Sequence, residues 1–466
     1  MCSFLFSRTR NPVRQHLLNR VNVFAKRRGP DSTDVMRLVD PQGFHICCLH
    51  NLLDISGSAA KQPAVNITSG KKKVLMFNGE IYNYDAINYS SDTAYLTKII
   101  GDSEWVSRLS SIDGEYAILI YDITENALVA ASDCFLTKPM FFGFSSISQD
   151  FAISSYASML QKIGLDKIEM ARPNTIYKFS LADAGCVTEI MKEPFSFDIN
   201  QYKKTYDAWI NAFVTSVEKR AVHGAHKPFV CLSSGYDSGA ICLALNLLNI
   251  DYETFSITSG EVVDILEQRI QKNKAGSCTK VHVWKGLSNW NAWRMRRDVR
   301  RNVEFFEYTH EDGPGYRKTI RKDEAALGLN FLAAHAASAG LKVCMSGAGA
   351  DEIHSDYGIL GEKIYYHSEF GGLFPDDLNG IFPWRKFYGD TQRSYLMKEE
   401  MVLGRHGIEG RYPFLDKKVV QEFLSLKVGL KNSVYKAPLA CFLRQHDYPF
   451  EANRKRGFTS RAGLEL

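Results

Sequence analysis

Two short segments carry the residue types of an anion-binding turn. The first, Ser233 to Ser238, follows the apolar run Phe229 to Leu232 and precedes a stretch with helical character. Small residues let the backbone approach a ligand closely, while serine hydroxyls, consecutive N–H groups and a helix N-terminus attract negative charge. Asp237 would repel a polyanion unless it shares Mg²⁺ with pyrophosphate oxygens. Taken alone, this turn favours an ordinary helix N-cap, which uses the same residue types.

The second segment, Ser346 to Glu352, follows the apolar run Lys342 to Met345 and ends in two carboxylates. In open α/β sheets, ligands bind beyond the carboxyl ends of the strands, so the two turns could face each other across a nucleotide. The sequence has no GxxxxGK[ST] loop, which disfavours an enzyme that transfers a γ-phosphoryl group. Asp237 and Asp351, one from each turn, are therefore the predicted ligands of Mg²⁺.

The elements that position these turns differ between the two halves of the chain. Before residue 192, short runs of β-branched and aromatic residues end close to Gly, Asp, Asn or Pro, which predicts a domain made mostly of sheet. The strands expected there are Val74 to Phe77, Tyr116 to Tyr121, Ala127 to Ala131, Met140 to Phe142 and Ile176 to Phe179. The stretch Lys192 to Tyr202 has no periodicity and contains Pro194, so domains are expected at residues 1–192 and 203–466.

The second half alternates between helical and apolar stretches. This alternation predicts a parallel sheet that is covered by helices on both faces. The expected elements are helices at Tyr206 to Val222 and Gly239 to Leu248, strands at Pro228 to Leu232 and Lys342 to Met345, and an Ala-rich stretch at Ala325 to Ala339.

Composition excludes several classes of protein. The 466 residues are 45% apolar and 23% charged, and no apolar run approaches the roughly 20 residues that cross a bilayer. The formal charge is only +5 and the basic residues are scattered, so neither a membrane nor a nucleic acid is an expected partner. The ten cysteines have irregular spacing without a CxxC pair, which fits reduced thiols in a cytoplasmic protein.

Ordered motifs along the chain resemble those of the glutamine-hydrolysing asparagine synthetase family. Ser233 to Ser238 resembles the family's pyrophosphate loop, usually SGGxDS, and Ser346 to Glu352 resembles its SGEGxDE. Gly407 to Asp416 is similar to its GxExRxPFLD. Further matches are Lys436, Arg454 to Phe458, Met1-Cys2, Arg28 to Asp31, Phe77 to Asn83, Ser91 to Thr93 and Asp113-Gly114. On these motifs, which keep the family's order, the chain is identified as an atypical member.

The resemblance implies an N-terminal αββα Ntn-hydrolase domain of the class II glutamine amidotransferase type. Cys2, which has a free α-amine once Met1 is removed, would attack the side-chain amide of glutamine. Asn78 and the Gly79 N–H would stabilise the oxyanion, and Glu80 and Asp92 would hold the amino group of glutamine. These four residues, Asn78, Gly79, Glu80 and Asp92, are the expected glutamine site.

For the second domain the resemblance implies a Rossmann-like α/β fold of the adenine nucleotide alpha hydrolase (PP-loop ATPase) type. A substrate carboxylate would attack the α-phosphate of ATP, and ammonia would then displace AMP from the acyl-adenylate. Mg²⁺ on both carboxylates, together with Lys436, would stabilise the developing charge; for Lys436 a solvated surface lysine is the alternative. The expected ATP-binding residues are Leu232, Ser233, Ser234, Gly235, Asp237, Ser238, Ile257, Ser346 and Gly347.

Three departures from the family limit how far its function transfers. A gapless local alignment puts Leu52 where the family has an arginine that binds the glutamine carboxylate, so Arg28 or Arg27 must reach it or glutamine binds weakly. Ala348 replaces the glutamate of SGEGxDE, so Glu352 or another residue covers its role or the acceptor chemistry differs. The stretch from 300 to 327 shows little of the aspartate-site sequence. The expected acceptor is a small-molecule or peptide carboxylate that need not be aspartate.

Three functions fit these observations. The leading one is a carbon–nitrogen ligase that uses ATP, Mg²⁺ and glutamine, and that forms AMP and pyrophosphate. The second is a glutamine-independent synthetase or cyclase, like β-lactam synthetases and lasso-peptide cyclases; Ala348 and Leu52 favour it, whereas the retained Cys2 disfavours it. The third is a non-catalytic regulatory homologue, which the retained carboxylates of both turns disfavour. The resemblance is also compatible with a homodimer.

Overall fold

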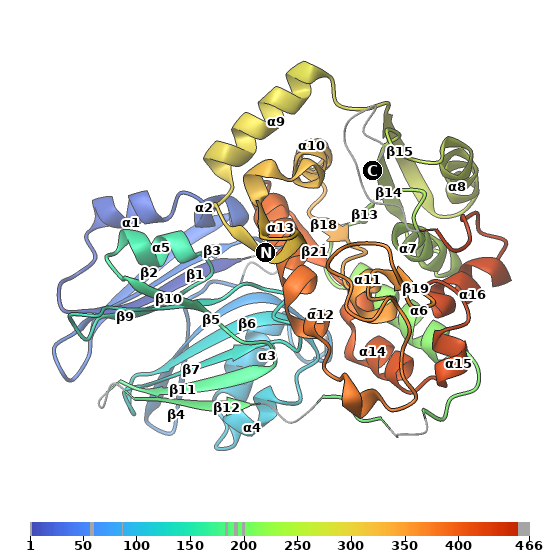
Figure 1. Ribbon diagram of the computed structural model, residues 1–466. Coiled ribbons are helices and arrows are strands. Elements are labelled where there is room, and N and C mark those ends of the chain that lie inside the picture. The colour runs from blue at the N-terminus through green and yellow to red at the C-terminus, as the bar shows by residue number, and fades with distance from the viewer. Residues whose placement is uncertain are drawn as a thin grey trace. The chain divides into compact units, whose positions relative to one another are not determined.

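The computed structural model in Figure 1 describes residues 2–55, 60–85, 87–181, 185–190, 194–197 and 201–454, with the backbone alone at 185–190. The chain forms two compact units. The first comprises Met1–Pro194 with Gly404–Gly407, and the second comprises Phe195–Leu403 with Ile408–Leu466. Most of the basic motif at 454–458 lies outside the described residues. Within the described ranges, no helix is long and apolar enough to cross a membrane.

The first unit is built on two antiparallel sheets of six strands each, in the orders β10-β8-β9-β1-β3-β2 and β12-β11-β7-β6-β5-β4. The strands are β1 (Ser3–Thr9), β2 (Ser32–Val39), β3 (His45–Leu52), β4 (Ala64–Thr68), β5 (Lys71–Ile81), β6 (Gly114–Asp122), β7 (Ala127–Ser132), β8 (Phe141–Phe144), β9 (Phe151–Ser154), β10 (Lys167–Met170), β11 (Thr175–Ser180) and β12 (Gly185–Ile190). The helices are α1 (Gln15–Val21), α2 (Ala25–Arg28), α3 (Asp92–Ile99), α4 (Trp105–Leu109) and α5 (Ala157–Lys162).

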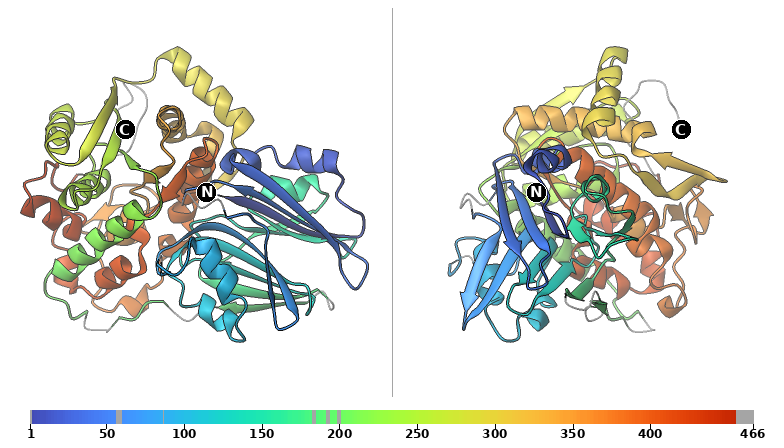
Figure 2. Two further views of the ribbon diagram at one scale, coloured as in Figure 1. Left: turned by 180° about the vertical axis from the view of Figure 1, so that it is seen from behind. Right: turned by 90° about the vertical axis from the view of Figure 1, so that its left-hand side faces the viewer.

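Successive side chains of a strand point to opposite faces of its sheet, and both faces of the sheet that contains β5 are covered. In β5, Val74 and Met76 enter the core between the two sheets, whereas Leu75 and Phe77 belong to a second core under α3 and α4. Helices α1, α2 and α5 lie beside the sheet that contains β1, as the ribbons of Figures 1 and 2 show. The order helix, sheet, sheet, helix confirms the αββα arrangement that the sequence predicted.

The second unit contains a five-stranded parallel sheet in the order β15-β14-β13-β18-β21, which confirms the predicted parallel α/β domain. Its strands are β13 (Pro228–Cys231), β14 (Tyr252–Ile257), β15 (Cys278–Trp284), β18 (Val343–Met345) and β21 (Glu409–Arg411). Its α-helices are α6 (Asp207–Val222), α7 (Tyr236–Leu247), α8 (Val263–Ala275), α9 (Asn289–Asn302), α10 (Glu324–Ser338), α11 (Ala350–His354), α12 (Arg385–Tyr388), α13 (Asp390–Gly404), α14 (Lys417–Leu424), α15 (Val428–Lys431) and α16 (Ala437–Gln445).

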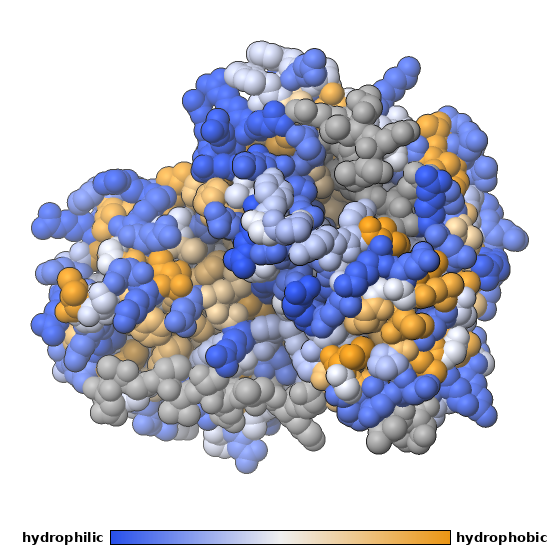
Figure 3. Space-filling view, viewed as in Figure 1, coloured by the Kyte–Doolittle hydropathy of each residue, from blue (hydrophilic) through white to orange (hydrophobic). Residues whose placement is uncertain are grey.

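Two small hairpins and three 3₁₀ turns complete the second unit. The hairpins pair β16 (Glu307–Gly313) with β17 (Tyr316–Thr319) and β19 (Gly358–Ile359) with β20 (Glu362–Lys363), and the 3₁₀ turns span Ile320–Lys322, Leu378–Gly380 and Pro413–Leu415. The arginine-rich α9 lies in a largely hydrophilic area of the face shown in Figure 3.

The strand order of the parallel sheet reverses between β13 and β18. The chain runs outward from β13 through β14 to β15, and then returns to the other side of β13 to form β18 and β21. Ligands of open α/β sheets bind at the carboxyl edge of such a reversal. The helix predicted from Gly239 to Leu248 starts three residues earlier than expected, because α7 begins at Tyr236 directly after the extended Gly235. Asp237 therefore belongs to the first helical turn.

Candidate active sites

Cys2 precedes β1 in the first unit and is buried. The even-numbered Phe4 and Phe6 of β1 share the inter-sheet core with β5, and the two-residue period of a strand directs Cys2 toward the same layer. The Cys2 Sγ lies 4.0 Å from the carbonyl oxygen of Leu53. His50 pairs with Phe4 in the sheet, and its Nε2 lies 3.0 Å from the Phe77 carbonyl oxygen. These links bring the start of β1 to the end of β5 where Asn78 and Gly79 stand.

Asn78 is fully buried, yet neither atom of its side-chain amide has a hydrogen-bond partner among the described residues. Buried polar groups are usually paired, so an amide in this state is expected to serve a ligand. Gly79 has a φ of +131°, and a Cβ there would stand 1.8 Å from the Glu115 carbonyl oxygen. Only glycine fits this position, which fixes the path of the backbone directly after Asn78.

Glu80 and Asp92, the predicted contacts of an amino group, come together in the structure. One carboxylate oxygen of each lies within 4.8 Å of the other, and both residues are buried. Ser91 caps α3 by accepting a hydrogen bond from the Ala94 N–H, which places Asp92 in the first helical turn. Gln62, which has no motif in the sequence, supports this region by accepting from the Phe77 N–H at 2.6 Å.

Arg28 is the arginine that the structure places beside the cysteine. Its side chain is completely buried, and its Nε donates to the Cys2 carbonyl oxygen at 3.0 Å. Leu52 is only half-buried at the end of β3, where it pairs with Ser32. His50, in contrast, is fully buried, and burial lowers its pKa to about 4, so the ring is neutral at physiological pH. Sequence reasoning did not single out His50, because no motif marks it.

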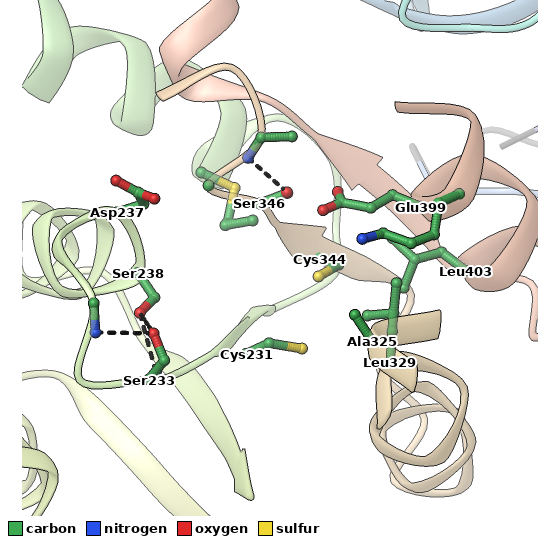
Figure 4. A pocket seen from close by; sticks show the side chains of 15 residues that line it. Cys231, Ser233, Asp237, Ser238, Ala325, Leu329, Cys344, Ser346, Glu399 and Leu403 are labelled. Atoms are coloured by element: carbon green, nitrogen blue, oxygen red, sulfur yellow. Dashed lines mark hydrogen bonds between the residues drawn. The ribbon is translucent and has the colours of Figure 1, made fainter. Parts of the chain in front are cut away.

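In the second unit, a pocket opens at the carboxyl ends of β13 and β18 (Figure 4). Of the predicted ATP-binding residues, six line it: Ser233, Gly235, Asp237, Ser238, Ser346 and Gly347. Leu232 and Ile257 are buried at the ends of β13 and β14 outside the lining, and Ser234 also faces away from it. The remaining lining residues are Cys231, Ala325, Leu329, Cys344, Met345, Ala348, Lys398, Glu399 and Leu403.

Hydrogen bonds inside the first turn fix its shape. The Ser238 hydroxyl accepts from the Ser233 N–H at 3.0 Å, and Arg269 of α8 donates to the carbonyl oxygens of Ser233 and Gly235, both at 2.6 Å. Arg269 also donates to the Pro449 carbonyl oxygen at 2.7 Å. Arg269 thus binds two carbonyl oxygens of the turn, whereas the N–H groups of Ser233, Ser234 and Gly235 are bonded to the side chains of Ser238, Glu261 and Ser233. The donors left for an anion are the first N–H groups of α7.

Ser234, which stands where the family pattern has glycine, binds a carboxylate of the same unit. Its N–H donates to Glu261 Oε2 at 2.6 Å, and its hydroxyl donates to the same oxygen. The Ser234 hydroxyl also accepts from the Val262 N–H at 3.1 Å. The turn therefore already holds one anionic group, and the sequence did not reveal it because Glu261 belongs to no motif.

Asp237 and Asp351 converge on one buried cation. Lys436 Nζ lies 2.6 Å from Asp237 Oδ1 and 2.8 Å from Asp351 Oδ1, and the Tyr435 hydroxyl donates to Asp351 at 2.7 Å. The Lys436 side chain is 1% exposed, so the alternative of a solvated surface lysine is wrong. Two carboxylates that meet around one positive charge also fit Mg²⁺, which takes carboxylate oxygens as ligands. The two turns are thus brought together as the sequence predicted.

Ala348 and Glu352 follow the same strand but meet different surroundings. Ala348 lines the pocket, and its N–H donates to the Ser346 hydroxyl at 3.0 Å. Glu352 is buried, and its Oε1 accepts from the Tyr357 hydroxyl at 2.5 Å outside the pocket lining. The carboxylate that does reach the pocket near Ala348 is that of Glu399, which comes from α13.

Comparison with known proteins supplies the family. A model described as a glutamine amidotransferase domain matches residues 50–162, and a model described as asparagine synthase matches residues 209–374. The chain belongs to the asparagine synthase family. A protein of Methanocaldococcus jannaschii that is assigned as a glutamine-hydrolysing asparagine synthetase is 25% identical over 427 residues, covering 86% of this chain and 73% of the relative. The asparagine synthetase of Gallus gallus is 24% identical over 458 residues, covering 88% and 75%.

This asparagine synthase family member has a class II glutamine amidotransferase domain of the Ntn type, followed by a parallel α/β domain of the adenine nucleotide alpha hydrolase type. The first domain implies that glutamine is a substrate, and the second implies the use of ATP. The sequence predicted both domain types.

Proposed function

We propose that this family member is a glutamine-dependent ligase that adenylates a substrate carboxylate with ATP and amidates it with ammonia. The observation that supports this most strongly is the buried Lys436 ammonium between Asp237 and Asp351. A binding or regulatory protein gains nothing from two buried carboxylates at a sheet edge, whereas an enzyme that handles pyrophosphate needs cations at that place.

In the first unit, the Cys2 thiolate attacks the side-chain amide of glutamine after its α-amine has accepted the thiol proton. The amide carbonyl oxygen becomes an oxyanion, to which the Asn78 amide and the Gly79 N–H donate. The unpartnered Asn78 amide supports this role, because it is already free to bind. Ammonia leaves, and water then hydrolyses the thioester to glutamate. Glu80 and Asp92 hold the substrate's ammonium group, and Arg28 is the candidate for its carboxylate.

In the second unit, an oxygen of the acceptor carboxylate attacks the α-phosphorus of ATP, and the bond to pyrophosphate breaks. The N–H and hydroxyl groups of the turn from Ser233 to Ser238 bind the phosphate oxygens, and Lys436 balances the charge that develops on pyrophosphate. Asp237 and Asp351 are the residues that would hold Mg²⁺, which would supply further positive charge on these oxygens. Ammonia then forms the amide bond as AMP leaves.

The pocket wall beyond the turns indicates the kind of acceptor. Ala325 and Leu329 of α10 and Leu403 of α13 supply an apolar surface beside the polar end of the pocket. A carboxylate that carries an apolar portion would bury that portion there, at about 25 cal/mol per Å². We therefore propose that the acceptor is a carboxylate with an apolar part rather than free aspartate.

The test measures pyrophosphate release from ATP with a panel of carboxylates, with either glutamine or ammonia as the nitrogen source, on protein from which Met1 has been removed. Asp351→Ala should abolish turnover with both nitrogen sources, whereas Cys2→Ala should abolish it with glutamine alone. The matched controls are Asp264→Ala on the exposed side of α8 and Cys441→Ala on α16, which should both leave turnover unchanged.

The outcomes separate the candidate functions. Turnover that does not depend on the nitrogen source, with an amine of the substrate as the nucleophile, would replace the proposal with a glutamine-independent synthetase or cyclase. Absence of nucleotide turnover with every acceptor would replace it with a regulatory role. Release of glutamate by the wild type but not by Cys2→Ala confirms the glutaminase half on its own.

A further inference from the structure

The carboxylate of Glu399 stands in the pocket and forms no ion pair with any residue that the structure describes. Glu399 lies on α13, lines the pocket, and forms a hydrogen bond with the Ser346 side chain through one oxygen. Its other oxygen, Oε2, is buried and has no hydrogen-bond partner among the described residues. A buried carboxylate oxygen in this state is costly, so it calls for a functional explanation.

Neighbouring residues do not satisfy this oxygen. The adjacent Lys398 also lines the pocket, but the described residues that its Nζ contacts are Asp323, at 3.7 Å, and the Tyr395 ring, whose centre is 4.4 Å away, rather than the Glu399 carboxylate. Of the described residues that line the pocket, only Asp237 also carries a carboxylate, and Asp237 is bound to Lys436. Glu399 is therefore the carboxylate of the described pocket lining that is available to react with a substrate.

The position of Glu399 places it near the second turn. The Ser346 hydroxyl that bonds to Glu399 also accepts the Ala348 N–H at 3.0 Å. In Figure 4 the Glu399 carboxylate projects toward Ser346, on the side of the pocket away from Asp237. It thus faces the space between the turn that binds phosphate oxygens and the apolar wall that would hold the acceptor.

The protonation state of Glu399 suits proton transfer at neutral pH. Burial raises its pKa to about 7, and the negative charges of Glu400 and Glu352 add to this effect, whereas the Ser346 hydrogen bond and Lys398 oppose it. Cys344 also faces it from β18, but its own pKa is raised well above the usual range, so that thiol stays neutral. A base whose pKa lies near the working pH transfers protons most effectively.

We propose that Glu399 is a catalytic residue of the amidation step, in which its carboxylate accepts the proton that the attacking amine loses. This inference rests on the proposed function. The nitrogen of ammonia forms a bond to the acyl carbon, the bond from that carbon to the AMP oxygen breaks, and one N–H proton passes to Glu399 Oε2. AMP leaves as the anion, and Glu399 returns its proton to water. The proposed base thus comes from helix α13, whereas the family's glutamate belongs to the turn that contains Ala348 in this chain.

The experiment compares two half-reactions in Glu399→Gln, Glu399→Asp and the exposed control Glu362→Gln. Exchange of pyrophosphate into ATP reports adenylation alone, and amide formation with ammonia reports both steps. Glu399→Gln should retain the exchange within about threefold but lose about 10²-fold in amide formation. Glu399→Asp should recover part of this loss. The rise of the wild-type amidation rate with pH, centred near 7, should be absent in Glu399→Gln.

Each other result overturns the inference in a recognisable way. Equal loss of exchange and amidation would assign Glu399 to acceptor binding or to pocket structure. Unchanged amidation with an unchanged pH profile would leave Glu399 without a catalytic part while the proposed function stands. Absence of exchange in the wild type with every carboxylate would remove the proposed function itself. Thermal unfolding of the three variants shows whether any loss comes from misfolding.

Discussion

Asn78→Leu should make the first unit more stable while it destroys glutamine hydrolysis. Both polar atoms of the Asn78 amide are buried and have no hydrogen-bond partner in the described part of the chain, and each unpartnered atom costs roughly 1–3 kcal/mol. Leucine has a similar volume and no polar atoms. After a deduction for imperfect packing, the expected gain is about 2 kcal/mol, which for a domain of this size raises Tm by roughly 4–8 °C. Loss of one oxyanion donor should lower kcat for glutamine by about 10² to 10³.

Asn51→Leu is the matched control, because Asn51 is equally buried but fully bonded. Its amide donates to Ser3 and Asn22 and accepts from Asn22 and Thr33, at 2.8–3.0 Å. This substitution leaves those partners unsatisfied and should destabilise the unit by roughly 3 kcal/mol or more. Glutamate release and amide hydrogen exchange in β5 and β6 would be measured for both variants. Equal destabilisation of the two, or an intact glutaminase in Asn78→Leu, refutes the reasoning.

Three further predictions concern charged or titrating groups. Lys436→Met leaves Asp237 and Asp351 without their shared ammonium and should lower pyrophosphate release by more than 10²-fold; release within tenfold of the wild type contradicts the role of Lys436. Glu261→Gln weakens the hold of a carboxylate on Ser234 and should lower the KM for ATP several-fold, whereas a higher KM would show that Glu261 supports the turn. His50 has a pKa of about 4 when folded and about 6.5 when unfolded, so the unfolded chain binds the proton more tightly and stability is lost as pH falls from 6.5 to 4. That loss is roughly 3 kcal/mol by pH 4 and about 2 kcal/mol at pH 5, and chemical unfolding of the wild type against His50→Gln at pH 7.5 and pH 5 should show the loss of about 2 kcal/mol in the wild type alone.

The parts of the structure that the sequence made predictable are those that a local pattern encodes. Small residues after an apolar run indicate a strand-to-helix turn. Both turns of the pocket, with the carboxylates Asp237 and Asp351, could therefore be identified from the sequence. An apolar run with β-branched and aromatic residues likewise predicted the central part of β5, Val74 to Phe77, and the alternation of helical and apolar stretches predicted the parallel sheet. Helix starts were harder, since the small residues before Gly239 fit a loop as well as the first turn of α7.

The residues that sequence reasoning missed are polar groups whose importance depends on burial and on partners far along the chain. Glu399 and Glu261 belong to no motif, and a helix or a loop brings each to a turn that lies 27 or more residues away. His50 lies in a strand where its type gives no hint that its ring reaches the Phe77 carbonyl. The one sequence signal that pointed toward Glu399 was Ala348, because the absence of the family's glutamate at this position implies that another residue supplies a carboxylate.

Arg269 links the turn from Ser233 to Ser238 to nearly the last described part of the chain. The same guanidinium holds the carbonyls of Ser233 and Gly235 and that of Pro449. The Tyr236 hydroxyl, at the start of α7, also accepts the Asn453 N–H at 3.0 Å. During synthesis the turn emerges from the ribosome more than 200 residues before these partners do. A nascent chain therefore cannot form these contacts of the turn until residues 449–453 have been synthesised, whereas the strands of the first unit's two sheets are already complete by residue 190.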